Sequence, residues 1–342
     1  MTFMDQEMHE EPQRIRQTLS GNAEIVRVIV GKVRNRRIRN IVVAGRGSSD
    51  HAATYFKYLC EIVAGIPVGF AAPSVLTVYQ GRLDLSDTLT FGVSQSGKAE
   101  DVLAVLRHAR RQGGLTVSIT NDPLSPLALE ADHHLNLFAG EEKSIAATKS
   151  FVCQMALFAL FVQTLTDDQA LKSQLDRLPE QMASTLEKKD SISQIAEIMT
   201  HSQACYVIGR GYVNAIAHEL ALKLQETCYM EAMPFSTSDF HHGPFAMLDQ
   251  DSLVLLLAPN DPSMPDSLEL LRKLLPTRAK VIAFTDTPDL PVDTKILLPE
   301  TSPAMSPFLF VLAGQMLAFD LSLRRGLDPD RPRGLSKVTI TR

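Results

Sequence analysis

The chain has 342 residues, a length typical of about two domains with substantial buried cores. It carries 34 Lys and Arg against 39 Asp and Glu, so its formal net charge is −5. This charge argues against nucleic-acid binding, because affinity for a polyanion depends on a cationic surface. One local site for a small anion is still compatible with it.

Composition also bears on location. The four cysteines form no CxxC pair, so we expect neither a zinc site nor a disulfide framework, and a reducing cytoplasm; they are Cys60, Cys153, Cys205 and Cys228. The N-terminus is acidic and polar, which is not the pattern of a secretory signal. The most apolar stretch, 145–165, contains Lys149, which favours a buried helix over a membrane span.

Taken in order, the elements predict an α/β protein. Residues 1–35 predict a helical arm. The first half then predicts strands at 40–44, 67–71, 88–93, 115–120 and 134–138, with helices at 50–64, 98–112 and 126–131. Helical patterns follow at 147–165 and 170–200. The second half predicts strands at 204–209, 253–258, 280–285 and 295–298, with helices at 213–229, 264–275 and 305–325. Apolar strands alternating with helices indicate parallel sheets covered on both faces.

The two halves repeat one pattern. The segment VVAGRGSSDHAATYFKYL from Val42 matches YVIGRGYVNAIAHELALK from Tyr206, 164 positions later. Apolar runs and a Thr-x-x-Pro-like turn recur at nearly the same offset. We therefore predict two tandem doubly wound parallel-sheet domains. The expected boundaries are an N-terminal arm at 1–35, a first domain at 36–165, a helical connection at 166–200, a second domain at 201–327 and a tail at 328–342.

Two loops of the first half are rich in Gly and Ser, and each follows a predicted strand and precedes a helix. Their candidate residues are Gly47, Ser48 and Ser49 in one loop and Ser94, Gln95 and Ser96 in the other. Small residues, hydroxyls and a helix N-terminus favour a phosphate, and ligands of open α/β sheets bind beyond the carboxyl ends of the strands. Neither loop has a complete nucleotide-binding signature. The alternative is that the serines only cap helices.

The second half departs at the equivalent loop. Ala258-Pro259-Asn260-Asp261 has no serine and carries a carboxylate, which would repel phosphate. We therefore expect one phosphate site per chain.

The helix expected at 213–229 carries Glu219, Lys223 and Glu226 on one face. Such spacing is often only a surface ion-pair ladder, but the imidazoles of His241 and His242 follow shortly afterwards on a Gly-Pro turn. Adjacent histidines point in different directions and no third ligand has a recognisable spacing, so we predict no metal. Three further histidines are interpreted as structural, namely His133, His134 and His218.

Several ordered blocks then resemble a known family. GRGSSDHA, SQSGKAEDV, AATKSF, ELALKLQETCYMEA, HHGPFAML and RPRGLSK are similar in order and spacing to the isomerase half of glucosamine-6-phosphate synthases, a pair of sugar isomerase (SIS) domains. The resemblance covers almost the whole chain. It includes the N-terminal arm at 8–12. No glutaminase domain precedes the match in this sequence, so we expect an isomerase half acting alone.

The resemblance implies roles for particular residues. Phosphate-binding positions correspond to Ser49, Ser94, Gln95 and Ser96, with Gly47 and Ser48 shaping the first loop. Glu226 corresponds to the isomerisation base, His242 to the ring-opening histidine, Lys223 to a neighbouring helix lysine and Lys337 to the lysine of a mobile tail. The chain departs from the family pattern at Lys98, Ala99 and Ala147, which leaves the exact sugar open.

These features lead to a functional expectation. Proton transfer between C1 and C2 of an open-chain sugar phosphate needs ring opening, a carboxylate base and stabilisation of developing charge. Without a glutaminase domain to supply ammonia, we expect the same proton transfer to run in the direction that releases ammonia. The expected activity is therefore that of a glucosamine-6-phosphate deaminase that needs no cofactor. Alternatives are a fructosamine-6-phosphate-type deglycase, a plain phosphosugar isomerase or a non-catalytic sugar-phosphate sensor. The family shares its active-site histidine between subunits, so we expect a homodimer with no nucleic-acid or membrane partner.

Overall fold

The structure, a computed structural model, describes residues 2–337 and divides into two compact units. The β1–β5 unit comprises Gln13–Glu142, Ala147–Asp176 and the chain from Leu335. The β6–β10 unit comprises the residues up to Pro12, Lys143–Ala146 and Arg177–Gly334. Each unit is described by itself.

The β1–β5 unit is built on a parallel sheet with strand order β2-β1-β3-β4-β5. Its strands are β1 (Asn40–Ala44), β2 (Val68–Phe70), β3 (Thr88–Val93), β4 (Leu115–Thr120) and β5 (His133–Asn136). β3 and β4 are buried along their whole length, as expected for strands covered on both faces.

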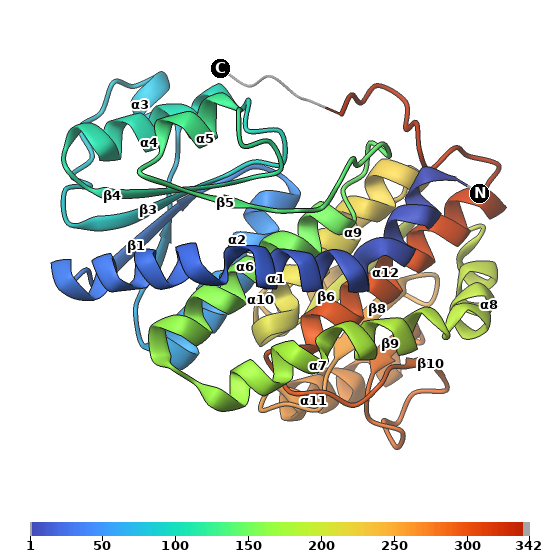
Figure 1. The fold of residues 1–342 in the computed structure, drawn as a ribbon. Helices are drawn as coiled ribbons and strands as arrows, with labels where there is room; N and C mark the ends of the chain where they lie inside the picture. Colours follow the sequence, from blue (N-terminus) through green and yellow to red (C-terminus); the bar gives the residue numbers. More distant parts are fainter. Residues whose placement is uncertain (1, 338–342) are drawn as a thin grey trace. The chain divides into compact units, whose positions relative to one another are not determined.

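Helices cover both faces of this sheet. They are α2 (Ser48–Leu59), which continues as a π-helical turn (Cys60–Ala64), α3 (Ser74–Thr77), α4 (Glu100–Arg111), α5 (Pro126–Glu130) and α6 (Lys149–Thr166). In Figure 1, α3, α4 and α5 lie on one face and α2 and α6 on the other. Stacked and edge-to-face rings join the second pair of helices to the sheet, because Phe56 of α2, Phe158 of α6 and Phe91 of β3 pack together.

The N-terminal helix α1 (Phe3–Arg36) crosses the boundary between the units. From residue 13 it belongs to the β1–β5 unit, where its Asn22 amide donates to the Asn136 carbonyl at 2.8 Å and accepts from the Asn136 N–H at 3.1 Å. Thr18 donates to the Leu137 carbonyl. The polar side of α1 is thus fixed to the end of β5.

The β6–β10 unit has strand order β10-β9-β8-β6-β7, and all of its pairings are parallel. Its strands are β6 (Ala204–Gly209), β7 (Glu231–Phe235), β8 (Leu253–Ala258), β9 (Lys280–Thr285) and β10 (Thr294–Leu297). Its main helices are α8 (Lys189–Met199), α9 (Asn214–Cys228), α10 (Thr237–His241), α11 (Met264–Leu274) and α12 (Ser306–Arg324), and α7 (Gln169–Leu186) enters it from residue 177. α12 packs against α8 and α9. Phe240 of α10 and Leu270 of α11 share the core cluster of β6, β8 and β9.

The internal repeat predicted from the sequence is confirmed by topology and register. Read from its other edge, the second sheet has the order β7-β6-β8-β9-β10, which matches β2-β1-β3-β4-β5 position by position. Val42 pairs with Thr90 in the first sheet, and Tyr206 pairs with Val254 in the second. Both partners are displaced by the same 164 residues that separate the repeats. The predicted pair of doubly wound parallel sheets is therefore confirmed.

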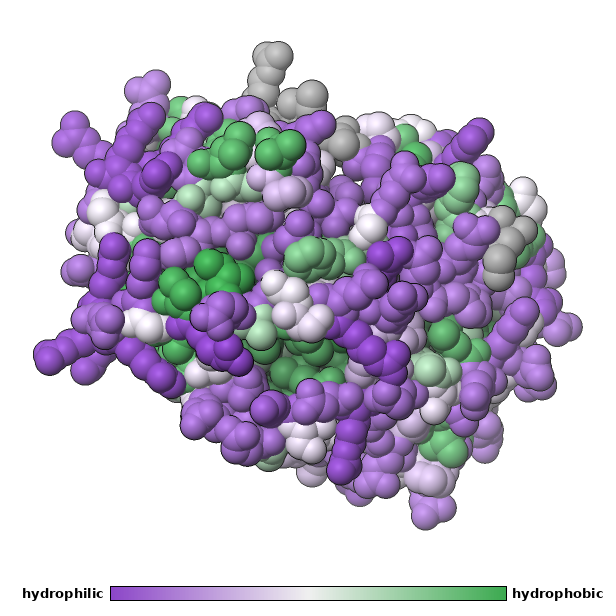
Figure 2. All heavy atoms as spheres, viewed as in Figure 1, coloured by the Kyte–Doolittle hydropathy of each residue, from purple (hydrophilic) through white to green (hydrophobic). Residues whose placement is uncertain are grey.

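The predicted helix at 147–165 is also confirmed as a core helix. α6 and α12 are long and apolar enough by composition to cross a membrane, but 78% and 83% of their apolar windows are buried inside the fold. The core helices of soluble proteins can be equally long and apolar, so these two helices are weak evidence for a membrane span. Figure 2 shows a face on which hydrophilic residues dominate and hydrophobic side chains form separate patches. All four cysteines are free and buried.

Candidate active site

The two Gly/Ser loops lie where the strand order of the first sheet reverses. β1 pairs with both β2 and β3, and one candidate loop follows β1 while the other follows β3. Chains leaving adjacent strands towards opposite faces open a crevice at their carboxyl ends. The topology therefore brings together the two loops that the sequence singled out.

The first loop is shaped by glycine and ends in a buried serine. Gly47 has φ +53, and a Cβ at Gly45 would lie 3.1 Å from the backbone of Ser49. Ser49 is 8% exposed, and its hydroxyl oxygen accepts from Gln154 Nε2 of α6 at 3.1 Å. Because a hydroxyl has one proton, this bond leaves the Ser49 O–H as a donor for a ligand.

The second loop is held rigidly by the chain around it. The Ser94 N–H donates to the Ile119 carbonyl at 3.1 Å, and the Gln95 carbonyl accepts from the Asn121 N–H at 3.0 Å. Gly97 has φ +63, and a Cβ there would lie 2.1 Å from Ser125 Oγ. Only glycine fits this turn, which leaves the half-buried residues Ser94–Ser96 at the rim of the crevice.

The alternative that the serines merely cap helices is wrong. The N-cap residue of α2 is Gly47 and that of α4 is Ala99, and neither supplies a side-chain cap. The Ser94 hydroxyl instead accepts from the Gly97 N–H within its own loop at 3.2 Å. Several first-turn N–H groups are engaged within the chain, because the Ser49 N–H donates to the Arg46 carbonyl at 3.1 Å and the Val102 N–H donates to Asp101 Oδ1 at 2.9 Å.

Two cations lie beside these loops, and they have different surroundings. Arg46 Nε contacts Asp101 Oδ2 of α4 at 2.7 Å. Arg210 pairs with Asp266 of α11 in the same way at 3.0 Å in the other unit, so this pairing is a structural feature of the repeat. Lys98 is exposed at the start of α4, where its charge faces the solvent near the second loop.

The equivalent loop of the β6–β10 unit is filled by the chain's own carboxylates. Asp261 Oδ1 accepts from the Ser263 N–H at 2.7 Å and from its hydroxyl at 2.6 Å. Asp286 Oδ1 accepts from the Asn260 N–H at 2.6 Å. These carboxylates occupy backbone donors and add negative charge at this loop, so a single phosphate site per chain stays a prediction.

Two of the three charged residues of α9, Glu219 and Lys223, are buried, so the group is not a surface ladder. Lys223 Nζ lies 3.4 Å from Glu219 Oε1 and 2.6 Å from Glu226 Oε2. The side chains of Glu219 and Lys223 are 0% and 1% exposed, whereas that of Glu226 is 20% exposed. Burying ions is costly unless each is paired, so the group is a specific construction. Glu226 is the carboxylate with access to solvent.

His242 belongs to a different segment of the same unit. It follows the short helix α10, where its N–H donates to the Asp239 carbonyl at 3.0 Å, and its side chain is exposed. Within residues 2–337 no hydrogen bond or ion pair is observed between its ring and α9. Its neighbour His241 is partly buried, and burial together with the nearby Lys273 lowers the pKa of His241.

Lys337 has a partner that sequence reasoning missed. Its Nζ donates to Glu142 Oε2 at 2.7 Å, and Glu142 is completely buried. Glu142 also accepts from the backbone N–H groups of Thr148 and Ser150 at 3.1 and 3.0 Å. Only the AATKSF block of the sequence pointed to this region, and nothing in it identified the upstream glutamate.

Two of the three histidines interpreted as structural lie on one strand. His133 and His134 lie in β5, and His134 Nδ1 is 3.0 Å from Ser118 Oγ. Burial lowers the pKa of both rings. Across the described residues, no group of three or more His, Cys, Asp and Glu side chains is placed to hold a metal ion.

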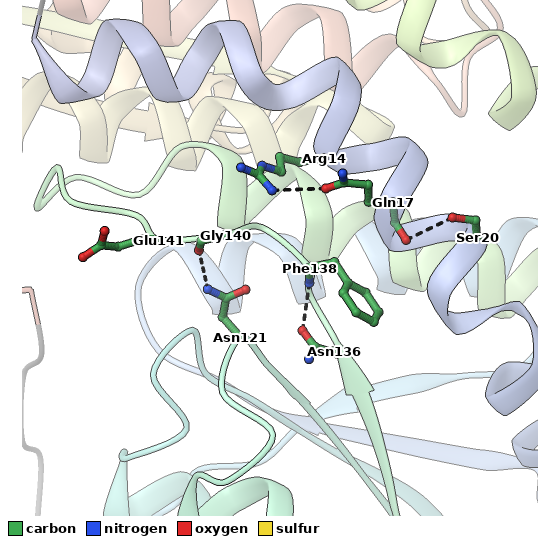
Figure 3. Close-up of a pocket in the computed structure, with 8 residues that line it drawn as sticks. All are labelled: Arg14, Gln17, Ser20, Asn121, Asn136, Phe138, Gly140 and Glu141. Atoms are coloured by element: carbon green, nitrogen blue, oxygen red, sulfur yellow. Dashed lines mark hydrogen bonds between the residues drawn. The ribbon is translucent and has the colours of Figure 1, made fainter.

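A polar hollow of about 690 Å³ also opens on the β1–β5 unit, away from the predicted residues. Figure 3 shows its lining from α1 and from the ends of β4 and β5. The Asn121 amide donates to the Gly140 carbonyl at 2.7 Å, and Arg14 donates to Gln17 at 3.1 Å. Its polar groups are thus largely engaged with one another.

The fold defines a class of protein, namely a duplicated doubly wound α/β protein with two parallel five-stranded sheets. A model of the SIS domain matches residues 36–163 and 198–324. The chain belongs to the SIS domain family.

Similar proteins refine this statement. The chain is 33% identical over 346 residues to glutamine–fructose-6-phosphate aminotransferase [isomerizing] of Methanothermobacter thermautotrophicus, covering 99% of this chain and 57% of that protein. It therefore spans little more than half the length of such relatives. It is 32% identical to a candidate phosphosugar isomerase of Silicibacter pomeroyi DSS-3, with a TM-score of 0.87 over 96% of this chain and 100% of the other. The C-terminal domain of the Francisella tularensis glucosamine-fructose-6-phosphate aminotransferase is 25% identical, with a TM-score of 0.89 over 97% and 98% of the two chains.

Proposed function

We propose that this protein is a glucosamine-6-phosphate deaminase, an isomerising enzyme that releases ammonia and fructose 6-phosphate. The observation that carries the proposal is the buried ionic group of α9, in which Lys223 holds the partly exposed carboxylate of Glu226 at 2.6 Å. A carboxylate fixed in this way has the chemistry of a base for a C–H proton next to a carbonyl. The serine loops supply the complementary recognition of a phosphate.

The proposed reaction begins with an open-chain amino sugar. His242 assists ring opening, and Glu226 then removes the proton from C2 to give an enolamine. Returning that proton to C1 gives the imine of fructose 6-phosphate, and water hydrolyses the imine to the ketone and ammonia. Lys223 and Lys337 are the cations assigned to stabilise the charge that develops on the sugar oxygen.

The choice of an amino sugar rests on chemical reversibility. A relative named for amination of fructose 6-phosphate with isomerisation must shift a proton between C1 and C2 of the aminated sugar. The same shift read backwards starts from glucosamine 6-phosphate. A deglycase acting on an amine-linked fructose 6-phosphate and a plain phosphosugar isomerase share this proton transfer and are the enzymatic alternatives.

The experiment is a substrate panel assayed for three products. Purified protein is incubated separately with glucosamine 6-phosphate, fructosamine 6-phosphate adducts and fructose 6-phosphate, and ammonia, free amine and aldose phosphate are measured. Ammonia from the first substrate supports the deaminase. Turnover confined to the second or third identifies the deglycase or isomerase, and binding without turnover identifies a sensor. The variant Glu226→Gln controls for contaminating activity.

Two companion proposals concern assembly and location. We propose a homodimer, because the family shares its histidine between subunits, and sedimentation of a fully active monomer would contradict it. We also propose a cytoplasmic location, which the free, buried cysteines support. Neither a nucleic-acid nor a membrane partner is proposed.

A further inference from the structure

The buried carboxylate of Glu142 links two parts of the β1–β5 unit that are far apart in sequence. Oε1 accepts from the N–H groups of Thr148 and Ser150, and Oε2 accepts from Ser150 Oγ at 2.7 Å and from Lys337 Nζ at 2.7 Å. The last contact spans 195 residues of sequence. One side chain thus joins the start of α6 to the C-terminal segment.

The two oxygens have separable tasks. Thr148 is the N-cap residue of α6 and supplies no side-chain cap, so Oε1 satisfies backbone donors that the helix start leaves open. Oε2 is not needed for those donors. It contacts a side-chain hydroxyl and the tail ammonium instead, so the carboxylate does more than cap a helix.

Charge explains why the tail contact is strong. Burial alone would raise the pKa of Glu142, but Lys337 and the hydrogen bonds from Ser150 outweigh burial and hold that pKa below its usual range. The carboxylate therefore stays ionised at neutral pH. An ionised group without contact with water needs a cation, and within residues 2–337 the ion pair of Glu142 is with Lys337.

We propose that Glu142 is a positioning residue that anchors the C-terminal segment and sets the place of the Lys337 ammonium for the reaction. This inference rests on the proposed function insofar as Lys337 acts on the sugar. The anchoring itself does not depend on any reaction. Glu142 contributes through Lys337 and is not assigned a contact with substrate.

The key variant is Glu142→Gln. The amide retains one oxygen for the Thr148 and Ser150 N–H groups, but it replaces the charged acceptor at Lys337 by an uncharged side chain. Lys337→Met removes the ammonium with little change in length. Ser150→Ala is the matched control, because it deletes a hydrogen bond to the same carboxylate oxygen and leaves the lysine contact.

The first measurement is hydrogen–deuterium exchange at residues 335–337 without any substrate. Glu142→Gln is expected to raise the exchange rate about 10-fold or more, since one lost charged hydrogen bond of about 1.5–3 kcal/mol corresponds to such a factor. Ser150→Ala is expected to leave exchange there near the wild-type rate. Equal exchange in Glu142→Gln and wild type would overturn the anchor, whatever the enzyme does.

The second measurement separates anchoring from catalysis. Glu142→Gln is expected to lower kcat about 100-fold, the scale of a misplaced catalytic group, with KM within a few-fold of wild type. The double variant with Lys337→Met is expected to be no slower than the slower single variant, because both act through one ammonium. Additive losses, or faster tail exchange with unchanged kcat, would overturn the positioning role. If the wild-type protein turns over no sugar phosphate, the proposed function fails while the exchange result still decides the anchor.

Discussion

Replacing Glu226 by Gln tests whether Glu226 is the catalytic base or only an ion-pair partner of Lys223. Gln has the shape of Glu but cannot take a proton, so the rate of ammonia release should fall by about 10²- to 10⁴-fold, the usual contribution of a positioned base. Substrate affinity should change little, because the phosphate loops are untouched. Coupled assays of ammonia and fructose 6-phosphate give kcat and KM.

The structure also fixes the expected cost in stability. Lys223 keeps Glu219 at 3.4 Å when Glu226 is neutralised, and the new amide oxygen can still accept from the ammonium. The free energy of unfolding should therefore fall by only about 1 kcal/mol, measured by urea denaturation.

Glu219→Gln is the matched control. Glu219 is fully buried, so its loss should cost more stability, on the scale of about 3 kcal/mol for a broken buried pair, with a smaller effect on kcat. Wild-type ammonia release by Glu226→Gln would refute the assignment of the base. If both variants had equal and small effects on kcat and stability, the three residues would be an ordinary ion-pair ladder.

Three further predictions concern the phosphate, the tail and pH. Ser96→Ala should weaken binding of a sugar phosphate by about 1–3 kcal/mol, measured by calorimetry. Ser49→Ala should weaken binding by a similar amount and also reduce stability, because the buried Gln154 amide loses its hydrogen-bond acceptor. Unchanged affinity in both variants would contradict the assignment of the two loops as a phosphate site. Deleting the chain from Gly334 should leave phosphate affinity nearly unchanged and greatly reduce turnover, and it should also lower the free energy of unfolding, because the buried Glu142 carboxylate loses the Lys337 ammonium. Intact turnover would exclude a role for Lys337. Burial lowers the pKa of His134, so its contribution to stability is present above the unfolded-state value of about 6.5 and is lost as pH falls through the folded-state pKa. His134→Gln should flatten that fall in unfolding experiments without abolishing it, since His133 behaves alike, and an unchanged slope would contradict this.

Most of the fold could be predicted because parallel strands and amphipathic helices leave local patterns. β7 could not. Its sequence EAMPF contains Pro234, which normally argues against a strand, but β7 lies at the edge of its sheet, where a missing N–H is tolerated. The short helices α3 and α10 also escaped prediction, because four or five residues carry too little periodicity.

The site was only partly predictable for a related reason. Each phosphate loop combines glycine, serine and a helix start in one short segment, so its chemistry can be predicted from local sequence. Burial is not local, and the spacing of Glu219, Lys223 and Glu226 gave no sign that the group faces the interior. Glu142 was missed because its partner Lys337 is 195 residues away, a distance that no motif spans.

The most direct test follows the substrate proton during deamination. Glucosamine 6-phosphate is incubated with the protein in ²H₂O, and ammonia, fructose 6-phosphate and the isotope at C1 are measured together by enzymatic assay and NMR. We predict equal amounts of ammonia and fructose 6-phosphate, transfer of the C2 hydrogen to C1 with partial exchange against deuterium, and loss of all three signals in Glu226→Gln. Tight binding of glucosamine 6-phosphate with neither ammonia release nor hydrogen exchange would contradict the account.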